Sequence, residues 1–440
     1  MHTLEQLRAG QLAGVQRLDL SCGLTEFPTE IFDLADSLEI LNLSGNALSD
    51  LPADLPRLHK LRVLFCSDNQ FTSVPEVLGQ CPHLSMIGFK ANQIHTLPAA
   101  ALTPALRWLI LTDNQLRELP EEIGNCMAMQ KLMLAGNQLR HLPETMKACT
   151  NLELLRIADN QFSYLPEWLL ALPRLSWLAY AGNPFSAPAE ATAVAAATAR
   201  TIEWSSLEVQ QKLGEGASGV IYQAQWLRPA ADPQPVAVKL FKGARTSDGL
   251  PGSEMAACLS AGAHPNLIAV EGKISHHPEG TDGLVLQLIA PEFRNLGGPP
   301  SLASCTRDVY AAGTSFSIAV VLRIARSIAS ATQHLHTRGI MHGDLYAHNI
   351  LTTKAGQCLL GDFGAACFFT SDQPQTARAL QRLEVRAFAC LLDDLLMHCT
   401  EPATSTTMQA LRNLQQQCAQ PEVAARPLFT EIQQILAELR

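Results

Sequence analysis

Three polar side chains in the second half of the chain have types and spacing that suit phosphate chemistry. Asn349 follows Asp344 by five residues, and Asp362 follows Asn349 by thirteen. A carboxylate can hold a hydroxyl nucleophile in line, while an amide and a second carboxylate can hold Mg²⁺ on nucleotide phosphates. These residue types could therefore carry metal-dependent phosphoryl transfer, provided that other elements of the chain can bind the nucleotide.

A glycine-rich segment and a lysine lie upstream of these residues. Gly214, Gly216 and Gly219 follow the pattern GxGxxG, in which the missing side chains let backbone N–H groups close over phosphates. Residues 236–239 have strand-like composition and end in a lysine, and Glu254 begins a short helical pattern. A GxGxxG pattern alone is weak evidence, but four elements in one fixed order are much more specific.

The order and spacing of these elements resemble those of the protein kinase family over about residues 205–440. The resemblance implies that Asp344 positions the hydroxyl, that Asn349 and Asp362 hold Mg²⁺ or Mn²⁺, and that ATP is the phosphate donor. It also implies that Glu254 orients Lys239 toward the α- and β-phosphates. The remaining residues expected to contact the nucleotide are Gly214, Gly216, Gly219, Ile221, Ala237, Leu286, Leu288 and Leu351, with a hinge at 286–289.

Several positions depart from the family pattern. Gly343 replaces the usual arginine of the catalytic loop, so we do not expect control by phosphorylation after Asp362. Only 21 residues separate Asp362 from Glu384, where we expect the next long helix to start, and no Ala-Pro-Glu motif lies between them. Tyr346 stands where a lysine is common, and His348 could partly compensate if it is protonated. These departures predict a shortened activation segment and C-lobe.

Three functions remain open at this stage. The favoured one is a protein kinase, with serine or threonine preferred over tyrosine as the acceptor. The His-Gly-Asp-Leu sequence at 342–345 also resembles kinase-like phosphotransferases that act on small molecules. A third possibility is an inactive kinase-like scaffold, although the retained Lys239, Glu254, Asp344, Asn349 and Asp362 favour activity.

The first half of the chain has a regular internal repeat. Leucine-rich segments such as 38–48 recur with a period of 23 residues and one step of 22. The pattern resembles leucine-rich repeats, in which stacked copies share one continuous core. We expect about eight repeats, with an asparagine side chain that satisfies backbone groups at each turn. The recurring asparagines are Asn46, Asn69, Asn92, Asn114, Asn137, Asn160 and Asn183.

The strands of the repeats should leave alternate side chains on a concave face. Two neighbouring columns of this face are apolar, apart from Lys131, which predicts a docking site for a protein substrate or regulator with Trp108 and Trp177 as anchors. The alternative is that the linker or the kinase-like lobe of the same chain covers this patch. The predicted docking residues are Ile40, Val63, Phe65, Met86, Trp108, Ile110, Met133, Leu154 and Trp177.

The fold class that follows is an α/β leucine-rich-repeat solenoid followed by a two-lobed α+β protein-kinase-like domain. We place the repeats at 1–186, an Ala- and Thr-rich cap and linker at 187–204, and the kinase-like domain at 205–440. This combination resembles leucine-rich-repeat protein kinases, and we expect a bacterial one.

Composition limits the partners and the cellular location that we expect for the chain. A net charge of −9 with few basic clusters argues against nucleic acid as a partner. No run approaches the ~18 apolar residues of a membrane span, and the N-terminus lacks a secretory pattern. The twelve cysteines include no CxxC pair, so we expect reduced thiols in the cytoplasm. Cys81, Cys126 and Cys149 should face the core of the repeats.

Overall fold

The computed structural model describes residues 2–196, 200–216, 218–229, 231–243, 245–246, 248–370 and 372–439. Ala217 of the glycine-rich segment and Ser371 after Asp362 lie outside the described residues. The chain divides into two compact units, Met1–Leu175 and Ser176–Arg440, and each is described by itself. No helix among the described residues has both the length and the apolar character needed to cross a membrane.

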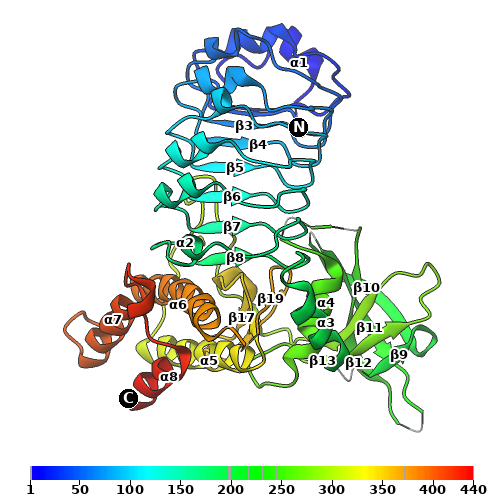
Figure 1. The fold of residues 1–440 in the computed structure, drawn as a ribbon. Coiled ribbons are helices and arrows are strands. Elements are labelled where there is room, and N and C mark those ends of the chain that lie inside the picture. Colours follow the sequence, from blue (N-terminus) through cyan, green and yellow to red (C-terminus); the bar gives the residue numbers. More distant parts are fainter. Residues whose placement is uncertain are drawn as a thin grey trace. The chain divides into compact units, whose positions relative to one another are not determined.

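The first unit is a stack of repeats, each with one short strand (Figure 1). The strands pair in parallel so that Ile40 lies opposite Val63, Val63 opposite Met86, and Met86 opposite Trp108. These strands are β1 (Arg17–Asp19), β2 (Ile40–Asn42), β3 (Val63–Phe65), β4 (Met86–Gly88), β5 (Trp108–Ile110), β6 (Lys131–Met133) and β7 (Leu154–Arg156).

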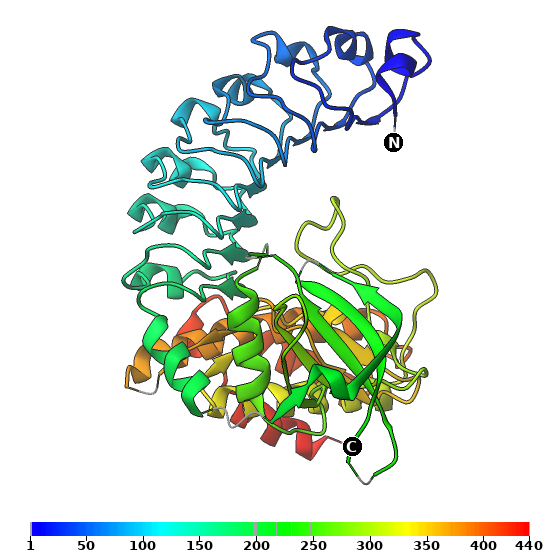
Figure 2. The ribbon, with the colours of Figure 1, turned by 90° about the vertical axis from the view of Figure 1, so that its right-hand side faces the viewer.

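The side of the stack opposite to the strands carries short helical turns (Figure 2). A proline directly precedes most of them, as at Pro75 and Pro143, where it ends the extended segment. After the N-terminal helix α1 (Leu4–Arg8), these turns are η1 (Thr29–Leu34), η2 (Leu55–Arg57), η3 (Glu76–Gln80), η4 (Ala99–Ala101), η5 (Glu121–Asn125), η6 (Glu144–Ala148) and α2 (Glu167–Leu170).

The recurring asparagines hold successive repeats together, as expected. Asn69 is buried; its amide oxygen accepts from Leu48 N at 2.9 Å and its amide nitrogen donates to Leu43 O at 2.9 Å. Asn137 makes the equivalent bonds to Leu116 N and Leu111 O. Each side chain thus satisfies backbone groups that the turn leaves unpaired. Three cysteines expected in this core are also buried, namely Cys81, Cys126 and Cys149.

The second unit begins with the last repeat and continues into a mixed sheet. Strand β8 (Trp177–Ala179) and helix α3 (Ala187–Ala196) come first. A six-stranded sheet follows in the order β10-β11-β12-β14-β13-β9, antiparallel except for the pair β13 and β9. Its strands are β9 (Thr201–Glu203), β10 (Leu207–Glu215), β11 (Gly219–Trp226), β12 (Gln234–Phe241), β13 (Val270–Ser275) and β14 (Gly283–Gln287), with a turn η7 (Trp204–Ser206) after β9.

Helix α4 (Pro251–Ala261) lies between β12 and β13 in the sequence and packs beside α3 (Figure 1). Proline in its first turn has a fixed φ that suits the start of a helix, and Gly262 ends it with a φ of +65°. The helix buries Glu254, a charged residue that needs a partner in such a place.

The remainder of the second unit is mainly helical. Its long helices, α5 and α6, bury apolar faces that include Ile328 and Phe388. The elements are β15 (Arg294–Asn295), α5 (Ile318–Thr337), β16 (Ile340–Met341), η8 (Ala347–Asn349), β17 (Ile350–Thr352), β18 (Cys358–Leu360), β19 (Cys367–Phe368), α6 (Pro374–Met397), α7 (Thr406–Cys418), η9 (Val423–Ala425) and α8 (Phe429–Glu438). Helix α6 begins at Pro374, so its expected start near Glu384 is wrong, and Glu384 lies inside the helix.

Candidate active site

The glycine-rich segment forms the turn between β10 and β11. Gly216 N donates to Gly219 O at 2.9 Å across this turn. A Cβ at Gly219 would lie 2.5 Å from Leu240 O, so a side chain is excluded there by the neighbouring strand. No described heavy atom lies within 4 Å of a Cβ built at Gly214 or Gly216, so these two glycines border open space. Backbone N–H groups in such a turn can approach phosphates closely.

Lys239 and Glu254 form a buried ion pair between β12 and α4. Their side chains are 12% and 2% exposed, respectively. Burial alone would lower the pKa of Lys239, but the carboxylates of Glu254 and Asp362 raise it above its ordinary value. Burial raises the pKa of Glu254, and the ammonium group of Lys239 opposes that rise. Lys239 is therefore a cation that Glu254 holds in place.

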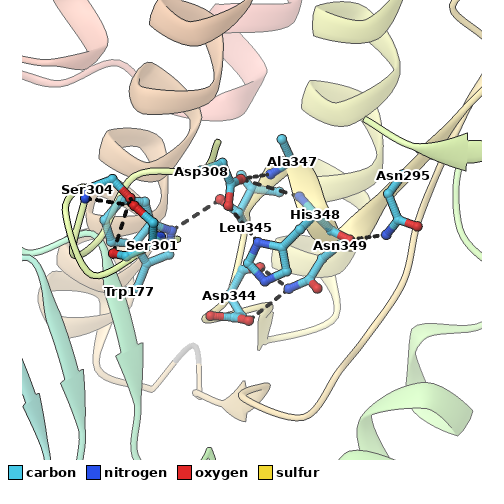
Figure 3. A network of polar contacts seen from close by, with 10 residues as sticks. All are labelled: Trp177, Asn295, Ser301, Ser304, Asp308, Asp344, Leu345, Ala347, His348 and Asn349. Atoms are coloured by element: carbon cyan, nitrogen blue, oxygen red, sulfur yellow. Dashed lines mark hydrogen bonds and ion pairs between the residues drawn. The ribbon is translucent and has the colours of Figure 1, made fainter. Parts of the chain in front are cut away.

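The segment 342–349 brings Asp344 and Asn349 together (Figure 3). The amide nitrogen of Asn349 donates to the Asp344 backbone carbonyl at 2.9 Å and to its carboxylate at 2.8 Å. His342 is fully buried; its Nε2 donates to Gly361 O at 2.9 Å, and its Nδ1 accepts from Asp344 N at 3.3 Å. These bonds orient Asp344.

Asp362 reaches the same site from the segment after β18. Its φ of +56° lies in the left-handed region that non-glycine residues seldom adopt, which is common at functional sites. Its Oδ1 accepts from Gly364 N at 3.2 Å. A Cβ on Gly364 would lie 3.2 Å from Asp362 Oδ1 and 3.8 Å from Glu254 Oε2, so both carboxylates lie close to Gly364. Asp362 thus faces the Lys239–Glu254 pair.

Asp308 is a residue of the candidate site that sequence reasoning missed. Its side chain is 2% exposed and accepts from Ala347 N at 2.5 Å, from His348 N at 3.3 Å and from His348 Nδ1 at 2.7 Å (Figure 3). Burial alone would lower the pKa of His348, but Asp308 raises it above its ordinary value. Asp308 lies in the connection between β15 and α5, where no motif marks it. The only sequence signal was the ionisable His348, which needs a partner when buried.

Glu384 of α6 is a second residue whose role was missed. Its carboxylate is 1% exposed and accepts from Gly343 N at 2.8 Å and from His336 Nε2 at 2.7 Å. Burial would raise the pKa of Glu384, but these donors and His342 hold it below its ordinary value. Glu384 therefore anchors the backbone of the segment that carries Asp344.

The other residues expected to contact the nucleotide, including Ala237 and Leu351 around the adenine, lie on or next to strands of the second unit. Ala237 of β12 is the Cα partner of Leu286 in β14, and Ile221 of β11 is the partner of Lys239. Leu288 directly follows the last residues of β14, and Leu351 belongs to β17. Their contact with adenine stays a prediction.

The docking surface expected on the repeats needs one correction. Trp177 is 1% exposed and stacks on Tyr346, with ring centroids 4.2 Å apart and an interplanar angle of 8°. Trp177 therefore cannot anchor an external partner, because its ring is already occupied within its own unit. Val63, Met86, Met133 and Leu154 are also buried.

The rest of that expected surface is partly exposed. Phe65 and Trp108 meet edge to face at 6.2 Å, and Lys131 Nζ lies 4.3 Å from the Trp108 ring centroid. Gly88 makes room for this cluster, since a Cβ there would lie 2.6 Å from Phe65 Cδ1. Ile40 and Ile110 are half-buried in the same strand positions.

The donor set of the site fits ATP with Mg²⁺. Among the described residues, no group of three or more His, Cys, Asp or Glu side chains is placed to hold a metal ion. Mg²⁺ is usually bound by one or two carboxylates together with substrate phosphates, rather than by a cage of protein ligands. Asp362 and the amide oxygen of Asn349 suit that mode, and Lys239 supplies a cation for the phosphates.

Comparisons with known proteins agree with this geometry. Residues 207–390 match the family described as protein tyrosine and serine/threonine kinase, and residues 37–58 match the leucine-rich repeat. A putative serine/threonine-protein kinase of Acanthamoeba polyphaga mimivirus is 28% identical over 190 residues, covering 42% of this chain and 31% of that protein. A probable serine/threonine-protein kinase of Arabidopsis thaliana is 27% identical over 173 residues, covering 39% of this chain and 22% of that protein.

A third relative is a serine/threonine-protein kinase homologue of varicella-zoster virus (strain Dumas). It is 32% identical over 116 residues, which cover 26% of this chain and 25% of that protein. The chain thus spans less than a third of the length of each of these curated relatives. Taken with the repeats of the first unit, these matches support a leucine-rich-repeat and protein-kinase architecture for the chain.

Proposed function

We propose that the chain is an ATP-dependent protein kinase that transfers the γ-phosphate to a serine or threonine hydroxyl of another protein. The observation that carries the proposal is the convergence of Lys239, Glu254, Asp344, Asn349 and Asp362 from separate elements of the second unit. The serine/threonine-protein kinases among its relatives support the choice of acceptor.

Each of these side chains has a distinct role in the proposed reaction. Lys239 binds the phosphates of ATP as a fixed cation, because Glu254 holds its ammonium group in one place. Asp344 orients the acceptor hydroxyl and takes its proton during transfer, and Asn349 restrains the Asp344 carboxylate. Asp362 and Asn349 hold the metal ion, which neutralises charge on the phosphates when bound. The protein contributes mainly positioning and electrostatic stabilisation.

The repeats have a proposed role in recruiting the substrate or a regulator. The half-buried cluster of Phe65 and Trp108, with Lys131 beside it, offers aromatic surface and one cation on the concave strands. Aromatic residues are enriched among the side chains that dominate binding energies at interfaces. In the full chain, Phe65→Ala combined with Trp108→Ala should raise the KM for the protein substrate and leave the KM for ATP unchanged.

Other features of the proposal concern the setting and the limits of the domains. We place the protein in the cytoplasm of a bacterium, with repeats at 1–186, a cap and linker at 187–204, and a kinase domain at 205–440 that has a shortened activation segment and C-lobe. Mg²⁺ is the expected metal, and Mn²⁺ is the alternative.

The decisive experiment incubates the purified full chain with γ-labelled ATP, Mg²⁺ and a cell lysate, in parallel with Asp344→Ala. Labelled protein bands that disappear with Asp344→Ala would support the protein kinase. Label that enters only small molecules would indicate a small-molecule phosphotransferase instead. No transfer with the wild type would indicate a scaffold without kinase activity.

A further inference from the structure

The last repeat contacts the segment that carries Asp344. Besides the stacking of Trp177 on Tyr346, Trp177 Nε1 donates to Leu345 O at 3.2 Å (Figure 3). The space between Trp177, Asp308, Tyr346 and Asp394 is only about 10 Å³, which is at the lower limit for one water molecule. A tryptophan from the repeat thus holds both the backbone and a side chain of this segment in a closely packed contact.

The backbone of β8 also explains the glycine at position 343. Gly343 has a φ of +74°, and a Cβ there would lie 2.8 Å from Leu178 O and 2.4 Å from Ala365 O. The repeat strand and the carbonyl of Ala365 therefore both occupy the space that any larger residue at 343 would need. Next to it, Tyr180 OH donates to Phe368 O at 3.1 Å, and Tyr180 N donates to Cys367 Sγ at 3.0 Å. The same strand thus contacts the segment that follows Asp362.

The cap helix after the last repeat contacts the helix that carries Glu254. Glu190 of α3 accepts from Ser253 Oγ of α4 at 3.1 Å, and it also accepts from Gly182 N at 2.8 Å. About two helical turns further along α4, Ser260 Oγ donates to Ala193 O at 3.2 Å. Because Ser253 directly precedes Glu254, these contacts restrain helix α4 next to the residue that pairs with Lys239.

We propose that residues 177–193, the last repeat strand and its cap helix, are a positioning element that holds the catalytic segment 342–349 and helix α4 in the arrangement needed for phosphoryl transfer. The inference rests on the proposed kinase function and adds residues that position its catalytic groups. Trp177, Tyr180 and Glu190 are its positioning residues. A phosphorylated residue paired with a basic side chain can order a loop, and here contacts from the repeat order the catalytic segment instead.

The two sides of this element should affect different kinetic constants. Contacts at 342–349 set the position of Asp344, and a displacement of about 1 Å at a catalytic group can lower the rate by roughly 10²-fold. Contacts on α4 set the position of Glu254 and so the binding of ATP phosphates by Lys239. Loss of the contacts at 342–349 should therefore lower mainly kcat, and loss of the contacts on α4 should raise mainly the KM for ATP.

The first test measures phosphate transfer from ATP to casein by the full chain. Trp177→Ala should lower kcat by roughly 10- to 100-fold with little change in the KM for ATP, and Trp177→Phe should recover most of kcat because it keeps the stacking on Tyr346. Ser253→Ala combined with Ser260→Ala should raise the KM for ATP with a smaller effect on kcat. Trp168→Ala, a tryptophan of α2 outside these contacts, is the matched control.

The second test does not depend on transfer activity. Hydrogen–deuterium exchange of the full chain should be faster at 342–349 in Trp177→Ala and at 251–261 in the double serine variant, but in neither region in Trp168→Ala. If Trp177→Ala does not fold, the exchange of Trp177→Phe and of the double serine variant can still be measured. If the wild type transfers no phosphate to casein or to any lysate protein, the proposed function fails, and exchange alone decides on the positioning element. If the folded variants show neither faster exchange nor altered kinetics, residues 177–193 are not a positioning element.

Discussion

The contacts of Asp308 lead to a quantitative prediction about the active site. Its buried carboxylate is the acceptor for the backbone N–H groups of Ala347 and His348 and for the His348 ring. These donors directly precede Asn349, which restrains Asp344. Replacing Asp308 should therefore disturb both the stability of the second unit and the orientation of Asp344.

The magnitude follows from the number and type of bonds lost. Asp308→Ala leaves buried donors and one partner of a buried ion pair without an acceptor, which should lower the free energy of unfolding by about 3–5 kcal/mol. Asp308→Asn keeps the side-chain volume and one carbonyl acceptor, but its NH₂ group would face one of the N–H donors. We therefore expect the free energy of unfolding to fall by about 1–3 kcal/mol. Both variants should lower kcat by roughly 10- to 100-fold through misplacement of Asp344.

The assay combines urea unfolding with steady-state transfer from labelled ATP. Glu292→Gln is the matched control, because Glu292 is an exposed acid of the connection that follows β14. Glu292→Gln should change the free energy of unfolding by less than ~0.5 kcal/mol and kcat by less than twofold. Wild-type stability together with wild-type kcat in Asp308→Asn would refute the idea that Asp308 organises the active site.

Three further predictions concern catalysis, regulation and pH. Asp344→Ala should lower the rate of transfer from labelled ATP by at least ~10²-fold, and full activity in this variant would contradict the mechanism. Replacing Thr370, Ser371 and Thr376 together by alanine should preserve activity, whereas a large loss that acidic residues restore would indicate control by phosphorylation. The lowered pKa of Glu384 stabilises the fold above the ordinary glutamate pKa of about 4.3, and this contribution is lost as pH falls through the folded-state pKa. Urea unfolding between pH 3 and 6 should therefore show a shallower loss of stability at acid pH for Glu384→Gln than for the wild type, and equal slopes would exclude this role.

Much of the candidate site could be proposed from the sequence because its residues lie in short motifs with fixed spacing. The pairing of Lys239 with Glu254 and the approach of Asn349 to Asp344 follow from such motifs, and the structure has both. Asp308 was not predictable, since it lies in a long connection and reaches the site only through the tertiary fold. Glu384 was misread as the start of a helix because Pro374, a favourable first-turn residue, was not recognised as the helix start.

The repeats show a different limit of sequence reasoning. Their period and asparagines predicted the parallel strands and the bonds between successive turns, because every copy carries the same pattern. The same regularity led to the error at Trp177. A periodic pattern identifies which side of the strand a residue faces, but it carries no information about what covers that side. For Trp177 the cover is Tyr346, which lies 169 positions later in the sequence.

Gly343 shows how these two parts of the sequence depend on each other. Taken alone, a glycine in place of the usual arginine indicates only the loss of a cation. With the carbonyls of Leu178 and Ala365 at 2.8 and 2.4 Å from the position of a Cβ, the glycine is a steric requirement for strand β8 to lie there. Its N–H group is still used, because it donates to Glu384. Gly343 and Trp177 thus belong to one packing arrangement. Contacts from strand β8 take the place that a side chain at position 343 would otherwise fill.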